Sequence, residues 1–233
     1  MKRKFTLNMN IHKNIEIRDL GLYLVKEKIL VISDIHIGYE ESLNRSGILV
    51  PRVYFKEFLE RLKLMLNDVD MVIINGDFHH EFSKFTYADR DSSDQLMKII
   101  GDRKLIVIQG NHDPIVKFIL NLDIRKFYRI DDILICHGDE IIDEDSKVII
   151  IGHEHASIGI KENVRIEKYK AFLVGKYNKK TLIVMPSCNL ATEGSDILRD
   201  EKLSPYLKQN LDNFQVYIVS NKVYDFGKLK ELK

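Results

Sequence analysis

The amino-acid sequence predicts an α/β protein whose core consists of two packed β-sheets flanked by helices. Strand-like and helix-like segments alternate in the first half of the 233-residue chain, whereas strand-like segments follow one another with little helix between them in the second half. In addition, five hydrophobic runs end in a glycine-containing turn that carries Asp, Asn or His. This pattern favours two sheets packed face to face over a simple doubly wound sheet.

The first helix is predicted over residues 51–67, after a strand at 29–33. Pro51 suits the first helical position, where a backbone N–H has no intrahelical partner to lose. Apolar residues then recur close to every 3.6 positions, as in an amphipathic helix; they are Val53, Phe55, Phe58, Leu59, Leu62 and Leu66. The segments 37–50 and 78–91 lack a clear periodicity and are predicted to form loops above the strand ends.

Two more helices are expected before the chain becomes rich in strands. One covers residues 93–100 with Ser92 or Ser93 as its N-terminal cap, and the other begins at Pro114 and ends near Leu120. Six strands are predicted in the second half, at 133–136, 147–151, 171–174, 181–185, 214–219 and 223–226.

Composition predicts a soluble, cytoplasmic protein with one domain, residues 1–233. The length and the 45% hydrophobic content suit a single sizeable core. No run of about 18 apolar residues is present, so neither a membrane span nor a secretory signal is predicted. The two cysteines, Cys136 and Cys188, are too few for a disulfide framework and fit a reducing compartment, with a single bridge between them as the alternative.

The overall charge argues against a protein that grips duplex DNA by itself. Lys and Arg together number 36 and Asp and Glu number 35, so there is no strong positive excess. Residues 161–180 nevertheless hold seven basic side chains, which only Glu162 and Glu167 oppose. We interpret this segment as an ordinary solvated face, with a weak phosphate-facing patch as the alternative.

Side chains that can bind metals follow five predicted strands, in the stretches VISDIHIG, MVIINGD, LIVIQGNHD, ILICHGD and KVIIIGHEH. They are Asp34, His36, Asp77, Asn111, His112, Asp113, His137, His153 and His155. A single Asp or His after a strand is more often a turn former. Groups that follow successive strands of an α/β sheet, however, converge outside the carboxyl ends of those strands. We therefore expect these residues to form one site.

The mixture of side chains indicates a site for two divalent metal ions. Asp, His and an amide oxygen suit borderline metals, with Mn as the first expectation and Fe, Ni, Co or Zn as alternatives, whereas Mg or Ca would recruit oxygen ligands almost alone. A shared carboxylate could hold two ions roughly 3.5–4 Å apart, and a bridging hydroxide would then attack phosphorus in line.

Taken in order, these motifs resemble those of the calcineurin-like metallophosphoesterases. The stretches SDIHIG, NGDFHH, GNHD, CHGD and GHEH correspond to the family motifs D-x-H, G-D, G-N-H-D or -E, H and G-H-x-H, across residues 33–155. The resemblance implies a four-layer α-β-β-α fold, which agrees with the two-sheet core expected above. DIHIGYEESL and GILVPR are further similar to a compact archaeal branch related to the nuclease subunit of double-strand-break repair complexes.

The resemblance also implies roles for individual residues. The metal ligands would be Asp34, His36 and His155 for one ion, Asn111, His137 and His153 for the other, and Asp77 as the bridge between them. His112 resembles the family's general acid, and Asp113 would orient His112 and raise its pKa. His79 and His80 are not included among the ligands. Many members have H-G-H at the fourth motif, where this chain has an outer Asp139.

The function expected from the sequence is a phosphoesterase that acts on a small or flexible phosphate ester, with diesters slightly favoured because His112 would assist a poor alkoxide leaving group. Tyr39 and Arg45 are candidate substrate-binding residues, with an ordinary surface loop as the alternative. Two other functions stay open: a nuclease or end-processing phosphatase for DNA or RNA, with a helicase or ligase partner, and a non-catalytic scaffold stabilised by metal. The oligomeric state does not follow from the sequence.

Overall fold

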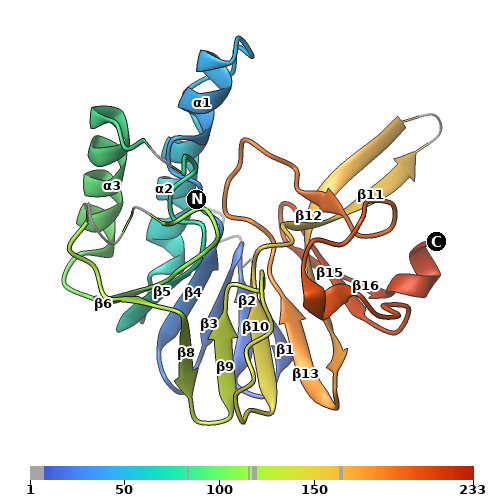
Figure 1. The fold of residues 1–233 in the computed structure, drawn as a ribbon. Coiled ribbons are helices and arrows are strands. Elements are labelled where there is room, and N and C mark those ends of the chain that lie inside the picture. Colours follow the sequence, from blue (N-terminus) through green and yellow to red (C-terminus); the bar gives the residue numbers. More distant parts are fainter. Residues whose placement is uncertain (1–7, 83, 115, 117–119, 163–164) are drawn as a thin grey trace, which may run out of the picture.

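Two β-sheets packed against each other form the centre of the molecule (Figure 1). The structure is a computed structural model that describes residues 8–82, 84–114, 116, 120–162 and 165–233. Both sheets contain parallel and antiparallel strands, and helices flank the core. The α/β fold class predicted from the sequence is therefore confirmed.

The first sheet has the strand order β1-β2-β3-β4-β5-β6-β7. Its strands are β1 (Asn8–His12), β2 (Ile15–Arg18), β3 (Gly21–Leu24), β4 (Ile29–Ser33), β5 (Met71–Asn75), β6 (Lys104–Ile108) and β7 (Ile124–Arg125). Neighbours from β1 to β4 pair antiparallel, and neighbours from β4 to β7 pair parallel. Every residue of β4 and β5 is buried, as expected for parallel strands covered on both faces.

The second sheet has the order β14-β11-β12-β13-β10-β9-β8, with β15 and β16 attached beside β12. Its strands are β8 (Phe127–Ile130), β9 (Ile133–Cys136), β10 (Val148–Ile151), β11 (Ala156–Glu162), β12 (Arg165–Tyr177), β13 (Lys180–Val184), β14 (Ser195–Asp196), β15 (Gln215–Val219) and β16 (Val223–Lys228). All six strands predicted for the second half are present. The strands β9, β10 and β13 run parallel to one another.

Side chains of the second sheet alternate between two hydrophobic cores. Ile135, Ile150 and Ile183 pack with the first sheet, whereas their neighbours Cys136 and Ile151 pack into a second core on the opposite face. This alternation follows from the two-residue period of a strand. A strand of β-branched residues can therefore be buried on both faces, with the side chains of each face packed into a different core.

The helix predicted over 51–67 is present but shorter, as α2 (Tyr54–Met65). The expectation that Pro51 is its first residue is wrong, because the chain turns before the helix begins. The carboxylate of Glu40 instead accepts hydrogen bonds from the backbone N–H groups of Tyr54 and Phe55, at 3.0 and 3.2 Å. Glu40 thus occupies the N-terminus of α2, where the helix dipole favours a negative charge.

Two helices extend into segments that were expected to be loops. α3 (Tyr87–Ile100) begins at a capping box formed by Thr86 and Asp89, so the prediction of a serine cap near residue 92 is wrong. α1 (Tyr39–Arg45) lies within the predicted loop 37–50 and buries none of its residues. Figure 1 shows α2 and α3 beside the first sheet and α1 projecting from the molecule above α2.

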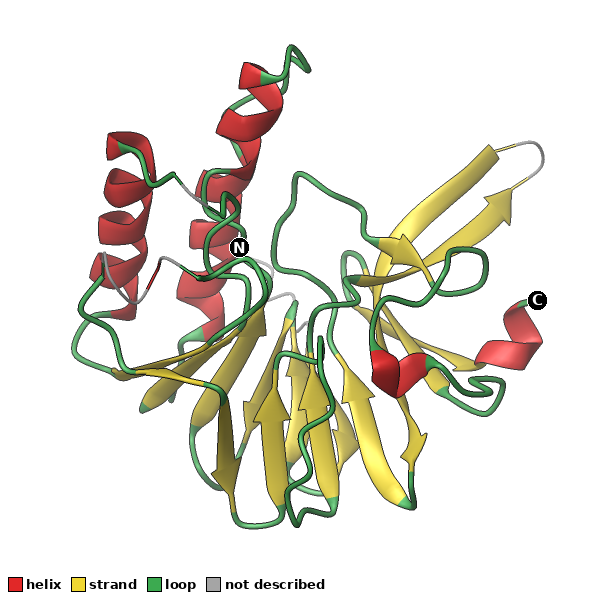
Figure 2. Cartoon of the chain, in the orientation of Figure 1, coloured by secondary structure: helices red, strands yellow, loops and turns green. Residues whose placement is uncertain are grey.

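The outermost layer beside the second sheet contains short 3₁₀ turns, η1 (Pro205–Leu207) and η2 (Leu229–Leu232), and loops (Figure 2). Tyr206 and Leu211 fill the second core from this side. The α-helices beside the first sheet and the two sheets form three of the four implied α-β-β-α layers. Within the described residues, no α-helix covers the second sheet. Apolar side chains on irregular backbone bury that face instead.

The helix predicted from Pro114 to about Leu120 falls largely outside the described residues. The basic segment 161–180 contains all of β12, which pairs with β11, β13 and β15. Within the described part of the chain, no helix is long and apolar enough to cross a membrane.

Candidate metal centre

The turns that follow β4, β5 and β6 lie side by side because these three strands are parallel neighbours. The His36 N–H donates to the Asp77 carbonyl at 2.9 Å and ties the first turn to the second. A side chain on Gly110 would overlap the Asp77 carboxylate, and one on Gly76 would overlap the His137 ring. The glycines of these turns therefore permit the close approach of the site residues.

One cluster of ligand atoms consists of Asp34, His36, Asp77 and His155, all within 4.8 Å of one another. The Nε2 atoms of His36 and His155 lie 3.1 Å apart. His36 Nε2 is 3.5 Å from an Asp77 oxygen, and His155 Nε2 is 3.5 Å from an Asp34 oxygen. Two carboxylates and two imidazoles thus point at one small volume.

A second cluster consists of Asp77, His137 and His153, again within 4.8 Å. His137 Nε2 lies 3.1 Å from His153 Nδ1, 3.5 Å from an Asp77 oxygen and 3.1 Å from the side-chain oxygen of Asn111. Asp77 therefore belongs to both clusters. All seven side chains that the resemblance implies as ligands come together here, in two groups that share one carboxylate.

The pKa values of Asp34 and Asp77 indicate that a positive charge is needed between the two carboxylates. Burial raises the pKa of Asp34, but the imidazoles of His155, His137 and His36 outweigh burial and leave that pKa below its usual value. Burial, and then the negative charge of Asp34, raise the pKa of Asp77 to about 9. Two buried carboxylates this close are stable only when a proton or a cation lies between them. The donor set therefore fits divalent ions.

Two of the histidines have lowered pKa values, which favour the neutral form that binds a metal. Burial lowers the pKa of His36 well below its usual value, and it lowers that of His153 to about 4. An imidazole must be unprotonated to coordinate a metal, so neither ring has to lose a proton at neutral pH.

Metal binding at pH 7 is accordingly expected to release about one proton, from Asp77, because an ion must displace the proton that burial holds there. Affinity for the metal should rise with pH until the pKa of about 9 is passed. Calorimetric titration in two buffers of different ionisation enthalpy measures the proton. Equal heats in both buffers would contradict the prediction.

Five of the seven residues have a left-handed backbone, which non-glycine residues seldom adopt. Their φ values are 54° at Asp34, 51° at His36, 46° at Asp77, 61° at His153 and 49° at His155. Aspartate and histidine tolerate this region better than β-branched residues do, although it still costs an L-residue about 1–2 kcal/mol. The sharp turns direct consecutive polar side chains into one site.

His112 lies at the edge of the first cluster, and its backbone N–H donates to the Asp77 carboxylate at 3.0 Å. Its ring Nδ1 is 2.7 Å from the carbonyl of His80, so Nδ1 carries the hydrogen and donates it. The expectation that Asp113 orients His112 is wrong. The Asp113 carboxylate is buried and accepts hydrogen bonds from three backbone N–H groups, those of Phe78, His79 and Gly110. Asp113 fixes the shape of the turns instead.

His80 also borders the site, although it is not among the ligands predicted from the sequence. Its ring stacks on His112, with ring centres 5.5 Å apart, and lies 5.4 Å from the ring of His36. Burial, and then the neighbouring His112, lower the pKa of His80 to about 4. Tyr39, a predicted substrate-binding residue, packs edge-on against His80 at 4.7 Å and so also borders the site.

Two other polar side chains near the site have partners outside the clusters. Arg45, predicted to bind substrate, forms an ion pair with Glu81 at 2.7 Å. His79 is buried, with Nε2 3.3 Å from Asp89 and Nδ1 3.0 Å from the Glu81 carbonyl. Leaving His79 out of the ligand set agrees with this position.

A cavity of about 350 Å³ adjoins the second cluster and is bordered by Asn111 and His137. Asp139, at the position where many family members have histidine, lines its wall together with Glu140 and Lys126. Lys126 and Glu140 form an ion pair at 2.7 Å. A group bound at the second cluster would therefore contact both negatively and positively charged side chains on this side.

The two-sheet α/β fold carries buried clusters of Asp and His side chains at its strand ends. This arrangement is typical of metalloenzymes. The family model of the calcineurin-like phosphoesterases matches residues 27–175, which is more than half of the chain. The chain belongs to this family and is a metal-dependent phosphoesterase. A search of curated proteins found no match.

Comparison with solved structures gives one match that supports the fold, followed by two weaker similarities. The nuclease MPE from Pseudomonas putida superposes with a TM-score of 0.69 at 17% identity, over 94% of this chain and 100% of that one. A protein of unknown function, AQ665 from Aquifex aeolicus, has 20% identity and a TM-score of 0.37, over 54% of this chain and 77% of that one. A Vps29 double mutant from Entamoeba histolytica has 17% identity and a TM-score of 0.39, over 85% and 99% of the two chains.

Proposed function

We propose that the chain is a binuclear phosphoesterase that hydrolyses phosphate esters, with diesters preferred over monoesters. The observation that carries the proposal is the position of Asp77, whose carboxylate is shared by two clusters of ligand atoms. Asp34, His36 and His155 would hold one ion with Asp77, and Asn111, His137 and His153 would hold the other. Manganese is the first metal to test, because the mixed oxygen and nitrogen ligands suit a borderline ion.

The bound ions would activate water as the nucleophile and stabilise negative charge on the phosphoryl oxygens. His112 is proposed to donate a proton to the departing alkoxide. Its Nδ1–H is held by the His80 carbonyl, so Nε2 is the ring atom that would deliver a proton to a substrate. Asp113 is not proposed to act in catalysis, because its carboxylate is occupied by the backbone.

Two residues of α1 are proposed to contact the substrate. Tyr39 borders the site through His36 and His80. Arg45 is exposed, and its partner Glu81 follows His80 directly, so a phosphate group near His80 would compete with Glu81 for the guanidinium. A phosphate that binds Arg45 would therefore displace Glu81 from this ion pair.

Nucleic acid is the second candidate substrate. The structural neighbour from Pseudomonas putida is a nuclease, and the sequence motifs resemble a branch related to a repair nuclease. A near-neutral overall charge favours a short, single-stranded or end-bound substrate over a long duplex. We further propose a single domain and a cytoplasmic location, which the two buried free cysteines support.

The test is hydrolysis of nitrophenyl diesters and monoesters after chelation and after addition of Mn²⁺. We expect activity that depends on the metal and is higher on the diester. Binding of Mn²⁺ without turnover on any ester would instead favour the non-catalytic scaffold. Gel shifts with short single strands over a salt series address nucleic acid, because phosphate contacts give a steep loss of affinity as salt rises.

A further inference from the structure

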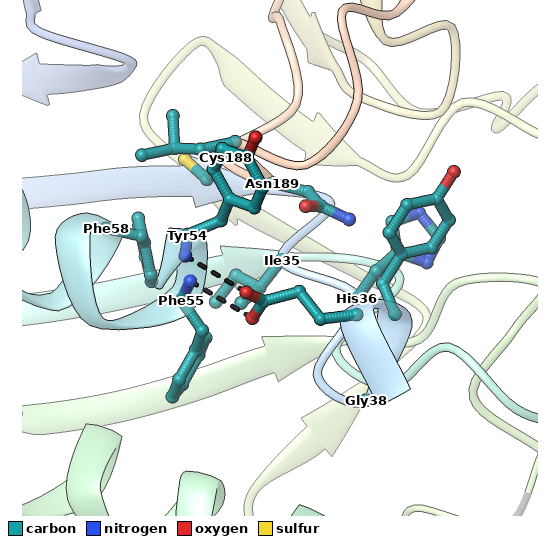
Figure 3. A pocket seen from close by; sticks show the side chains of 11 residues that line it. Ile35, His36, Gly38, Tyr54, Phe55, Phe58, Cys188 and Asn189 are labelled. Carbon is teal, nitrogen blue, oxygen red and sulfur yellow. Dashed lines mark hydrogen bonds between the residues drawn. The ribbon is translucent and has the colours of Figure 1, made fainter. Parts of the chain in front are cut away.

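A small pocket borders His36 on the side of α1 and α2 (Figure 3). Its volume is about 20 Å³. A water molecule needs roughly 10–15 Å³ of such volume, so the pocket accommodates one water and no organic group. Phe55 and Phe58 form part of the wall, and the polar residues that line it include His36, Glu40 and Asn189.

Two polar atoms of these lining residues are buried without a partner. His36 Nδ1 and Asn189 Nδ2 have no hydrogen bond to any described part of the chain. A buried donor that has left water and found no acceptor is unfavourable, so such groups in folded proteins are normally satisfied by protein atoms or by ordered water. Both atoms therefore need a hydrogen-bonding partner, either a protein atom or an ordered water.

The position and orientation of Asn189 are fixed by the segment that crosses behind the first metal-binding turn. The Cys188 N–H donates to the Ser33 carbonyl at 2.8 Å, and the Ser187 hydroxyl donates to the Asp34 carbonyl at 2.7 Å. Asn189 Oδ1 accepts a hydrogen bond from the Ala191 N–H at 2.9 Å. This bond distinguishes the two ends of the amide, so Nδ2 is the end left for the pocket.

Glu40 supplies the acceptor that the pocket needs. Each of its carboxylate oxygens accepts one backbone hydrogen bond at the start of α2, from Tyr54 and from Phe55, as the dashed lines in Figure 3 show. A carboxylate oxygen can accept a second bond. Asn189 Nδ2 is a donor, and His36 Nδ1 is also a donor if Nε2 faces a metal ion.

We propose that one ordered water molecule in this pocket accepts hydrogen bonds from His36 Nδ1 and Asn189 Nδ2 and donates to the Glu40 carboxylate. Three hydrogen bonds is the usual number for a buried water. The water joins a ligand of the first cluster to an anion at the N-terminus of α2. It thereby fixes the tautomer and ring orientation of His36, which makes Glu40 and Asn189 positioning residues for the metal.

The inference rests on the proposed function, because it requires His36 Nε2 to bind metal. Two measurements on the full chain test it. The first is a high-resolution crystal structure of the Mn²⁺-loaded protein, which should show a water within hydrogen-bonding distance of all three side chains. A pocket without water in a crystal that resolves other buried waters would overturn the proposal.

The second measurement is Mn²⁺ affinity by calorimetry for Asn189→Leu, Glu40→Gln and the double variant. Loss of such an outer partner typically weakens metal binding by about 10–100-fold. Because both residues act through one water, the losses should not multiply in the double variant; multiplied losses would mean independent structural effects and overturn the proposal. Thr192→Val is the matched control: Thr192 accepts a hydrogen bond from the nearby Gly194 N–H in the same segment and is not among the residues that line the pocket.

These outcomes separate the inference from the proposed function. If the wild-type chain binds no Mn²⁺, the proposed function fails and the inference fails with it. If the wild-type chain binds Mn²⁺ and both single variants bind it equally well, only the inference fails. Thermal unfolding of the metal-free variants shows whether each one is folded before its affinity is compared.

Discussion

Replacement of Asp77 by asparagine is expected to abolish paired metal binding and to lower activity by roughly 10²–10⁴-fold, because metal ions contribute several kcal/mol of transition-state stabilisation. Asp77 is the carboxylate that both ligand clusters share, so its charge serves both ions. Asparagine keeps the oxygen that accepts the His112 N–H, which preserves the turn. Elemental analysis after gel filtration measures the metal.

His112→Asn is the matched control for metal content, because the His112 ring lies beside the proposed ligands and is not one of them. Equal metal loss in the two variants would show that one role is assigned wrongly.

The stability of the metal-free protein separates metal loss from unfolding. A carboxyl whose folded pKa is raised lowers stability as pH rises above its unfolded pKa, since the unfolded chain ionises first. Metal-free Asp77→Asn should therefore melt at a higher temperature than wild type at pH 7.

His112→Asn is expected to separate substrates by their leaving groups. General-acid catalysis is typically worth about 10²–10⁴ in rate, and it matters most when the departing oxygen is a basic alkoxide. A nitrophenolate leaves without a proton, so the same variant should lose much less activity on a nitrophenyl ester. Rate constants at saturating Mn²⁺ for an alkyl and a nitrophenyl ester of one phosphate class supply the ratio of the two losses.

The ratio is insensitive to partial misfolding, which would lower both rates together. Equal losses on both esters would mean that the His112 ring positions the phosphate and does not protonate the leaving group. His80 would then be the next acid to consider, because its ring stacks on His112 within the same site. Its lowered pKa of about 4 argues against that role at neutral pH, since the ring would carry no extra proton.

The strand ends and their turns could be predicted from sequence because their signal is local. A hydrophobic run followed by glycine and a metal-binding side chain occurs within ten residues, as in the stretch that ends at Asp77. Parallel pairing of β4, β5 and β6 then brings those ends together without further information. Four of the seven proposed ligands follow β4, β5 and β6, and the other three follow β9 and β10 of the second sheet; the structure places all seven in two adjoining clusters.

The helix boundaries were harder because their signals were weak or ambiguous. α1 buries none of its residues, so its sequence has no apolar periodicity to detect. The start of α3 is a polar run in which several serines and aspartates could serve as the cap, and only the reciprocal bonds of Thr86 and Asp89 identify it. The helix cap at α2 comes from Glu40, which is distant along the chain.

Long-range contacts also explain the site residues that were missed. His80 reaches the site because its N–H donates to the Ile37 carbonyl across two strand ends. Asn189 approaches His36 because Cys188 and Ser187 are hydrogen-bonded to Ser33 and Asp34, more than 150 residues earlier. The family resemblance implies a catalytic role for Asp113, whereas its carboxylate accepts hydrogen bonds from the distant Phe78 N–H and from the Gly110 N–H.

The left-handed backbone at five of the proposed ligands has a consequence for selection. Glycine adopts that conformation without the steric penalty of an L-residue, so a mutation of Asp34 or His155 to glycine would relax the turn while it removes a ligand. Directed evolution for heat resistance of the metal-free chain alone would thus favour variants that have lost a proposed ligand. A screen that rewards turnover at each round is needed to keep thermal tolerance and catalysis in one lineage.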